Sequence, residues 1–565
     1  MATTGSATII ACAQGVQDCA FKSSDLTCAA YNDVFPSPRG SFVLLGSGIV
    51  VGSLMAFAIG GNDAANAWSS TVGSGAIPLR KALLIGGLGE WLGATLLGAG
   101  VSKTISKGIS DVQDPNCWAC GYCDSKMMIY AVGMMAALIG ASAFLMLATI
   151  SKLPVSTTHA IVGGVVGMTL YGAGGNCLTW GPWPKGLGAI IASWVISPLL
   201  SGVVCAIVYK CTDFGIIRAK QPVKRAIVAL PFLYGITTFV VVALTVLKSN
   251  ATKALDPGIM FGISLGFGSV VGVVVRVLVV PKVRADVDAL YPGTRGVPRG
   301  GAFTAIESAN AGTDGIRLAE RTVAQLATVD EPAVEVSREL NEARQSEQRG
   351  GGNGEGAGNG EGAGDRESAT QHAKTLATSS HHSGGIVRTH QEKASVHIFR
   401  NLLVFVAFLE SFAHGANDTA NATSAFSALL HAYDSGLYAC SFIETEWWVM
   451  SLAGAFVALG VNVMGYRVIQ TLGEDLTAID FQVGFSIELA TVLTVVLATC
   501  YGPGMPVSST HCKVGAVVAV GLMTGTEAGV KWSLFGKIFF AWALTVPLAG
   551  GVAAILTAVF SSVLF

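Results

Sequence analysis

The chain has 565 residues, of which 51% are hydrophobic and only 13% are charged, whereas an average soluble protein is about 25% charged. Its 35 Lys and Arg nearly balance its 36 Asp and Glu, so the net charge gives no argument for a nucleic-acid partner. This composition excludes an ordinary soluble domain and indicates an integral membrane protein embedded in a lipid bilayer.

Apolar runs long enough to cross a bilayer recur along the chain. A membrane-spanning helix needs about 20 mainly apolar residues, and scanning at this length predicts an all-α polytopic membrane protein with about twelve spans. The fourth and eleventh runs are short and rich in glycine, so each is also compatible with a re-entrant segment. The runs cover residues 41–59, 82–101, 127–150, 155–171, 187–209, 226–247, 258–280, 398–413, 447–466, 484–500, 507–523 and 535–560.

A polar segment separates the seventh apolar run from the eighth. Its centre reads RGGGNGEGAGNGEGAGDRE, which has too few apolar residues to offset the conformational entropy lost on folding. We therefore predict four parts: an extracellular N-terminal tail (1–40), a first transmembrane half (41–281), a disordered cytoplasmic linker (282–396) and a second transmembrane half (397–565). The first half contains one repeat and two connecting spans.

Basic residues predict which side of the membrane each loop faces. With the N-terminus outside, the short inner loops hold more Lys and Arg than the outer ones, among them Arg80, Lys81, Lys210 and Arg225. Lys and Arg concentrate in cytoplasmic loops. We therefore predict a plasma-membrane protein with both termini extracellular and the large loop cytoplasmic. Asn250, in the sequence NAT, would then be an exterior glycosylation acceptor.

The cysteines agree with this orientation, because thiols pair in oxidising compartments. Disulfides are favoured over a zinc site for the sequence CWACGYC, since the loop is exterior and contains no His. Eight of the twelve cysteines would lie outside: Cys12, Cys19, Cys28, Cys117, Cys120, Cys123, Cys177 and Cys440.

Two motifs occur twice. IGGNDAANAW begins at Ile59 and AHGANDTANA at Ala413, while LPVSTTHAIVGG begins at Leu153 and MPVSSTHCKVGA at Met505. The nearly constant spacing indicates two copies of one half. Seven crossings separate the first run from the eighth, so the copies would be inverted if the fourth run spans the membrane. Inverted repeats with interrupted helices around a midplane site are typical of secondary transporters.

The first motif places an Asp inside an apolar run in each half. A carboxylate in the membrane costs about 2.5–3.5 kcal/mol on insertion scales, so Asp63 and Asp418 need partners. Small neighbours allow close backbone approach and a break in the helix, and oxygen ligands suit a hard cation such as sodium. A helix-packing motif is the alternative. Amide oxygens are available from Asn62, Asn66, Asn417 and Asn421.

The second motif predicts a helix start in each half, with Pro followed by hydroxyl residues. Helix starts present free N–H groups and partial positive charge, so they can bind an oxyanion such as phosphate or sulfate. Ser156 and Ser508 could instead act only as caps. We expect His159 and His511 to brace the site by hydrogen bonds, with direct ligand contact as the alternative. The hydroxyl residues are Ser156, Thr157, Thr158, Ser508, Ser509 and Thr510.

Three further acids lie inside apolar runs. Glu90 and Glu488 lie in the middle of their runs, and Glu410 precedes Asp418 by two turns. Intramembrane carboxylates are candidates for cation ligands or proton sites, and we predict Glu90 and Glu488 as sodium ligands. Lys513 could neutralise one of these acids.

These motifs resemble the inorganic phosphate transporter (PiT) family of sodium–phosphate symporters. GGNDAANA and HGANDTANA resemble its G-[AG]-N-D-V-A-N-A signature, and STHCKVG and GFSIELA resemble its eukaryotic branch. The resemblance implies a twelve-span inverted-repeat fold that imports phosphate with sodium. It also implies that Glu90, His414 and Glu488 match acidic and His positions that are essential for transport in this family. Ala64 and Thr419 replace the signature Val, and Ser509 replaces the usual Thr.

The resemblance also limits the alternatives. It implies phosphate as substrate, sodium as coupling ion, no cofactor and no enzyme activity. A proton-coupled phosphate or sulfate carrier of the same fold is the second hypothesis, and an enzyme is the third and weakest. The oligomeric state stays open, with a homodimer as one alternative.

The linker generates a first prediction. If it only tethers two halves that each supply part of the site, deleting residues 350–364 should leave phosphate uptake nearly unchanged at equal surface expression. Uptake of labelled phosphate by cells expressing both forms measures this. A large loss of uptake would instead assign the linker a gating or folding role.

Overall fold

The computed structural model describes residues 38–98, 109–120, 125–181, 186–248, 252, 255–292, 294, 388–436, 440, 445–500, 507–524 and 529–564. Most of the N-terminal tail, the centre of the linker, Cys123 and the predicted glycosylation acceptor Asn250 lie outside these residues.

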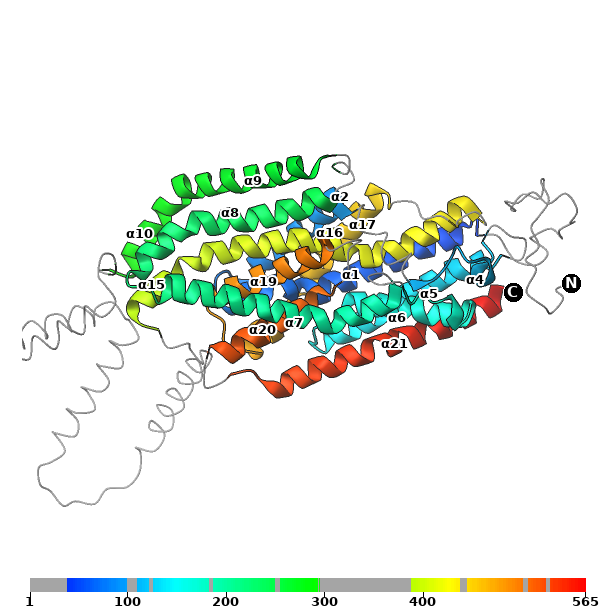
Figure 1. The fold of residues 1–565 in the computed structure, drawn as a ribbon. Helices are drawn as coiled ribbons and strands as arrows, with labels where there is room; N and C mark the ends of the chain where they lie inside the picture. Colours follow the sequence, from blue (N-terminus) through cyan, green and yellow to red (C-terminus); the bar gives the residue numbers. More distant parts are fainter. Residues whose placement is uncertain are drawn as a thin grey trace, which may run out of the picture.

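Each apolar run predicted from the sequence coincides with a helix over most of its described residues, and the described residues contain no β-strand, only one isolated bridge between Ser110 and Leu178. The long helices pack side by side in one elongated bundle (Figure 1). They are α1 (Phe42–Gly73), α2 (Leu79–Leu97), α5 (Met127–Ile150), α6 (Thr157–Gly172), α7 (Gly186–Thr212), α8 (Pro222–Lys248), α9 (Pro257–Val274), α16 (Phe399–Ser435), α17 (Trp447–Met464), α19 (Phe481–Cys500), α20 (Ser509–Met523) and α21 (Trp532–Leu564).

Eight helical stretches of the described chain are long and apolar enough to cross a membrane. They contain α1, α5, α7, α8, α9, α16, α17 and α21. Helices α6 and α20 have 16 and 15 residues, so each is shorter than the roughly 20 residues that a full crossing needs. The structure therefore defines a polytopic membrane protein, and twelve complete crossings stay a prediction.

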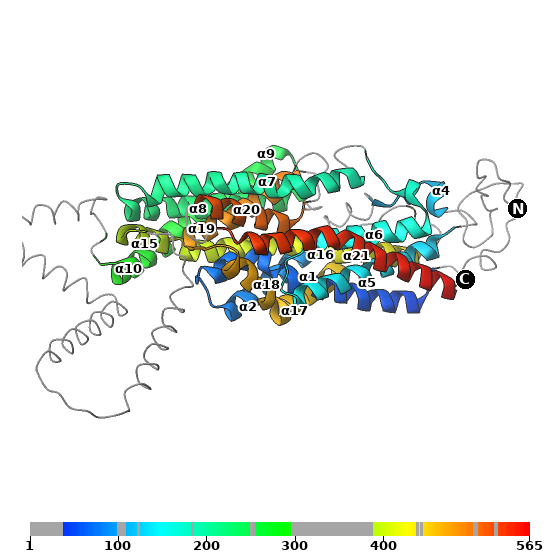
Figure 2. The same cartoon turned by 90° about the horizontal axis from the view of Figure 1, so that it is seen from below.

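The two ends of the described chain lie at one end of the bundle. The N-terminal end of α1 and the C-terminal end of α21 lie together, and α10 (Val280–Leu290) and α15 (His390–His397), which flank the linker, lie at the opposite end (Figures 1 and 2). The helices that flank the linker and the two ends of the described chain are therefore separated by the length of the bundle.

The predicted linker boundaries, 282 and 396, are wrong at both ends. Helix α10 continues to Leu290 because Val283 and Val287 pack into the core. Helix α15 begins after a capping box, in which the Thr389 hydroxyl accepts from the Glu392 N–H and the Glu392 carboxylate accepts from the Thr389 N–H. Both helices were too short and polar to stand out as apolar runs.

The predicted helix break at the two Asn-Asp motifs is also wrong, since α1 and α16 run without interruption through Asp63 and Asp418. The small residues serve close helix packing instead. A Cβ atom on Gly60 would lie 1.9 Å from the Val457 carbonyl oxygen of α17, and one on Gly460 would lie 2.0 Å from the Phe57 carbonyl oxygen of α1. The chain leaves helical geometry before α6 and α20.

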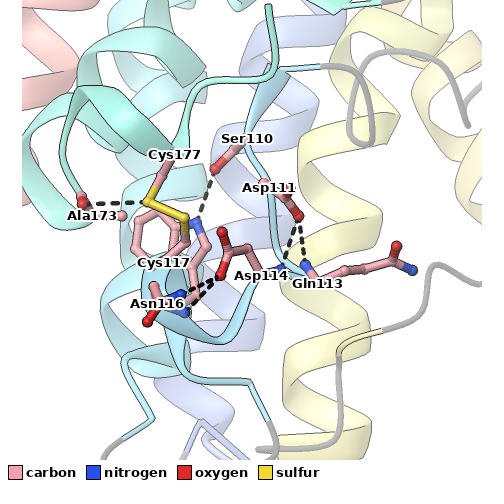
Figure 3. Close-up of a disulfide and its surroundings, with 9 residues drawn as sticks. Ser110, Asp111, Gln113, Asp114, Asn116, Cys117, Ala173 and Cys177 are labelled. Atoms are coloured by element: carbon pink, nitrogen blue, oxygen red, sulfur yellow. Dashed lines mark hydrogen bonds between the residues drawn. A yellow bond between two sulfur atoms is a disulfide. The ribbon is translucent and has the colours of Figure 1, made fainter. Parts of the chain in front are cut away.

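Two disulfides lie at the end of the bundle where α4 (Pro115–Trp118) is found. One joins Cys117 to Cys177, beside the turn in which Asp111 accepts two backbone N–H bonds (Figure 3). The other joins Cys120 to Cys440 and so connects the two halves. The preference for disulfides over zinc in CWACGYC is confirmed for Cys117 and Cys120.

The packing of α1 against α17 generates a second prediction. Gly60→Ala should destabilise the protein by about 1–3 kcal/mol, because an added methyl group overpacks the helix contact. Gly46→Ala is the matched control on the same helix, since a Cβ atom there meets nothing within 4 Å. Melting temperatures of the purified proteins compare the two. Equal melting temperatures would contradict the close contact at Gly60.

Candidate substrate and cation site

The two halves exchange equivalent contacts at the centre of the bundle. Asn66 of α1 donates from Nδ2 to Ser509 Oγ at 3.2 Å and to Thr510 Oγ1 at 3.1 Å. In the other half, Asn421 of α16 donates from Nδ2 to the hydroxyls of Thr157 and Thr158 at 3.1 and 3.3 Å. Each helix start is thus held by the Asn of the opposite half, so the site needs both halves.

Helices α6 and α20 begin where the sequence predicts. Ser156 and Ser508 are the N-caps, and their hydroxyls accept from the backbone N–H of His159 and His511 at 3.3 Å. A hydroxyl that accepts one bond keeps its proton to donate. The capping role is therefore established, and contact with an oxyanion is compatible with it.

His414 lies between the two motif carboxylates. Its Nε2 atom is 2.6 Å from Asp418 Oδ2 and 3.6 Å from Asp63 Oδ2, and the side chains of both Asp are at most 3% exposed. One ligand atom from each of the three residues lies within 4.8 Å of the others. The two halves thus bring their carboxylates to one position that can hold a positive charge.

Glu90 approaches the same His from its other side. The Nδ1 atom of His414 lies 2.8 Å from Glu90 Oε1. A Cβ atom on Gly415 would lie 2.1 Å from the Glu90 carbonyl oxygen, so glycine at 415 permits this approach of α2 to α16. His414 faces Glu90 with Nδ1 and the two Asp carboxylates with Nε2, so a doubly protonated imidazole supplies one positive charge among three carboxylates.

The hydroxyls of α20 complete the surroundings of the carboxylates. Ser509 Oγ donates to Asp418 Oδ2 at 2.6 Å, and Thr510 Oγ1 donates to Asp63 Oδ1 at 3.4 Å. Asn66 Oδ1 is buried without a hydrogen-bond partner among the described residues. A buried polar atom without a partner is unfavourable, so this oxygen is suited to contact a bound ion or substrate.

The other two Asn residues have local partners. Asn62 Oδ1 accepts from the Val155 N–H at 2.9 Å, and its Nδ2 donates to Thr149 and to the Leu153 carbonyl. It therefore positions the segment before α6. Asn417 Nδ2 donates to Asp418 Oδ1 at 3.1 Å.

His159 and His511 do not brace the site through hydrogen bonds, as the sequence predicted, but through contact between their rings. Both nitrogens of His159 and Nδ1 of His511 are buried without a hydrogen-bond partner in the described part of the chain. The two rings instead contact each other, with centroids 4.4 Å apart. Ring packing thus joins the starts of α6 and α20.

Two tryptophans flank this His pair and were missed by sequence reasoning. Trp194 lies 4.0 Å from His159 and Trp542 lies 3.8 Å from His511, measured between ring centroids. A signal was available, because SWVISP from Ser193 and AWALTVP from Ala541 each place a Trp shortly before a Pro in corresponding helices.

A second charged cluster lies beside the first. Lys513 of α20 pairs with Glu488 of α19, and its Nζ atom is also 3.5 Å from Glu410 Oε2 of α16. Lys513 and Glu488 are fully buried. This contact favours the alternative in which Lys513 neutralises one of the intramembrane acids, with Glu488 as its partner.

Together these groups can bind charges of both signs. The carboxylates of Asp63 and Asp418 suit a hard cation, and the starts of α6 and α20 suit an oxyanion. Both kinds of group meet in a buried site that two halves of a polytopic membrane protein share, which is the architecture of a membrane transporter.

Comparison with known proteins identifies the family. A profile of the phosphate transporter family matches residues 59–553, so the chain belongs to the phosphate transporter family. This is a family of transporters and not a class of enzymes. The resemblance inferred from the motifs is thereby confirmed.

Individual relatives cover nearly the whole chain. Sodium-dependent phosphate transporter 1-A of Danio rerio is 30% identical, over 88% of this chain and 92% of that protein. The phosphate-repressible phosphate permease of Neurospora crassa is 26% identical, over 90% and 95%. A solved structure of a sodium-dependent phosphate transporter matches with a TM-score of 0.65 at 26% identity, covering 92% of this chain and 100% of that one.

The double role of the capping serines generates a third prediction. Ser508→Ala should lower the melting temperature, since losing an N-cap costs about 1 kcal/mol. It should also raise the half-saturating phosphate concentration, up to roughly a hundredfold, because a buried hydroxyl contact is worth about 1–3 kcal/mol.

Ser508→Asn separates the two effects, because Asn is also a good N-cap. It should restore the melting temperature and leave the half-saturating concentration high in uptake assays at fixed sodium. If Ser508→Asn restores both quantities, the hydroxyl serves only as a cap.

Proposed function

We propose that this protein imports inorganic phosphate coupled to sodium, by alternating access of one central site. The observation that carries the proposal is the convergence of Asp63 and Asp418, one from each half, beside the hydroxyl-bearing starts of α6 and α20. A cation at the carboxylates would offset part of the charge of an anion bound at the helix starts. Binding of one would therefore favour binding of the other.

The proposed phosphate site combines the hydroxyls of the two helix starts with the motif residues. Helix N–H groups and hydroxyls bind an oxyanion without the bidentate clamp that Arg provides, and a carrier must release its substrate. Its members are Asp63, Asn66, Ser156, Thr157, Thr158, Asp418, Asn421, Ser508, Ser509 and Thr510. His159, His511, Glu410 and Lys513 would support it.

The proposed sodium site centres on Asp63 and Asp418. Asn62 and Asn417 are their neighbours in the sequence, and Glu90 lies near them in space. Glu90 reaches the carboxylates through His414. The sodium-dependent names of the vertebrate relatives support sodium as the coupling ion.

For the fold around this site we propose two inverted repeats with twelve spans in the plasma membrane. The equivalent contacts of Asn66 and Asn421 support a repeat. The start of α1 and the end of α21 lie opposite α10 and α15, which supports termini on one side and the linker on the other (Figure 1). The excess of basic residues in the loops on the linker side supports a cytoplasmic linker.

The proposal generates a fourth prediction. Asp63→Asn should abolish sodium-driven phosphate uptake and leave a folded protein, because the amide preserves the shape of the side chain and removes its charge. Asp434→Asn is the matched control, since it makes the same change at an exposed position of α16. Uptake of labelled phosphate with and without sodium measures both.

The same assay tests the alternatives. Wild-type uptake that is independent of sodium and driven by a proton gradient would identify a proton-coupled carrier. Competition by sulfate at concentrations similar to phosphate would broaden the substrate class. Sodium-driven uptake at the wild-type rate in Asp63→Asn would refute the assigned role of this carboxylate.

A further inference from the structure

The charged cluster of Glu410, Glu488 and Lys513 occurs in the second half alone. In the aligned motifs, Glu410 corresponds to Met55 and Lys513 to Ile161; the shared triplet L-A-T, at 147–149 and 497–499, aligns Glu488 with Leu138. These three counterparts are fully buried and belong to one apolar core cluster. The fold therefore accepts apolar side chains at these positions, and packing alone does not explain the charges.

The cluster carries a net negative charge, because a single ammonium group offsets only one of its two carboxylates. Two carboxylates face one Lys, so the net charge is −1 when all three are ionised. Glu410 Oε1 and Glu488 Oε1 are buried without a hydrogen-bond partner among the described residues. Removing one partner from a buried ion pair leaves an uncompensated charge and is strongly unfavourable. Without Lys513, the two carboxylates would need another cation.

Lys513 is also coupled to the central site. It follows Ser509 by one turn of α20, and Ser509 donates to Asp418. Glu410 precedes His414 by one turn of α16, and His414 contacts Asp418. The ammonium group is therefore fixed on the helix that also holds the proposed anion site.

We infer that Lys513 is a built-in cation that takes the place of one sodium ion between Glu410 and Glu488. This inference rests on the proposed function and refines it: sodium is bound at Asp63 and Asp418, whereas Glu488 is neutralised by the protein itself. Because the Lys513 ammonium group occupies this position, the protein binds one sodium ion fewer than it otherwise would.

Equilibrium binding of radioactive sodium to the purified full-length protein tests this inference. Lys513→Met should bind one more sodium ion per chain than the wild type, and sodium dependence of uptake should become steeper. Lys513→Arg keeps the charge and should retain the wild-type number. Lys513→Gln gives the same test as Lys513→Met if the Met variant cannot be purified.

A triple variant that copies the first half, Glu410→Met with Glu488→Leu and Lys513→Ile, identifies the ligands. It should bind the wild-type number of sodium ions, because the acids and their internal cation are removed together. Loss of one ion in the triple variant would mean that these acids hold sodium in the wild type, and would overturn the inference. No gain of sodium in folded Lys513→Met or Lys513→Gln would also overturn it.

The experiment separates this inference from the proposed function. A wild-type protein that binds no sodium refutes sodium coupling itself. A wild type that binds sodium, together with uncharged Lys513 variants that gain none, refutes only the built-in cation.

Discussion

The burial of two carboxylates within the membrane is the constraint on which the rest of the site depends. Asp63 and Asp418 have almost no exposed side-chain surface, and a charged group at such a depth must be compensated. The compensation comes from two helices: the His414 imidazole of α16 lies between the carboxylates, and hydroxyls from the start of α20 donate to both. The helices that carry the carboxylates also pack closely against their neighbours, α1 against α17 at Gly60 and α16 against α2 at Gly415, where a side chain would collide with a backbone carbonyl. The helix packing and the chemistry of the site therefore involve the same helices, α1 and α16.

Features set by neighbouring residues could be predicted from the sequence, whereas features set by contacts between distant segments could not. Local features could be predicted: apolar runs became helices, and the Pro-Val-Ser motifs mark helix starts with Ser156 and Ser508 as caps. The packing of these elements against one another could not be predicted. Small residues around Asp63 permit either a broken helix or a tightly packed one, and only the presence of α17 decides between them. The sequence also singled out His159 and His511, but ring contact between them depends on the spatial meeting of two helix starts.

The site combines a repeated framework with an unequal distribution of charge. Asn and hydroxyl contacts occur in equivalent form in both halves, whereas His414 and Glu410 lie on α16 at positions where α1 has Ile59 and Met55. A repeated framework gives an anion similar contacts from each half. Unequal charge makes the two halves differ in their response to cations. On the proposed function, the repeated contacts would recognise the substrate, and the charges found only in the second half would set how many ions are coupled to it.

The disulfide between Cys120 and Cys440 has a consequence for the integrity of the chain. Cys120 precedes the linker and Cys440 follows it, so the two halves are connected twice: by the peptide backbone and by the sulfur bridge. A protease that cuts within residues 295–387 would produce two fragments that migrate as one species until a reductant is added. The nicked protein would keep its halves covalently joined at the end of the bundle opposite α10 and α15.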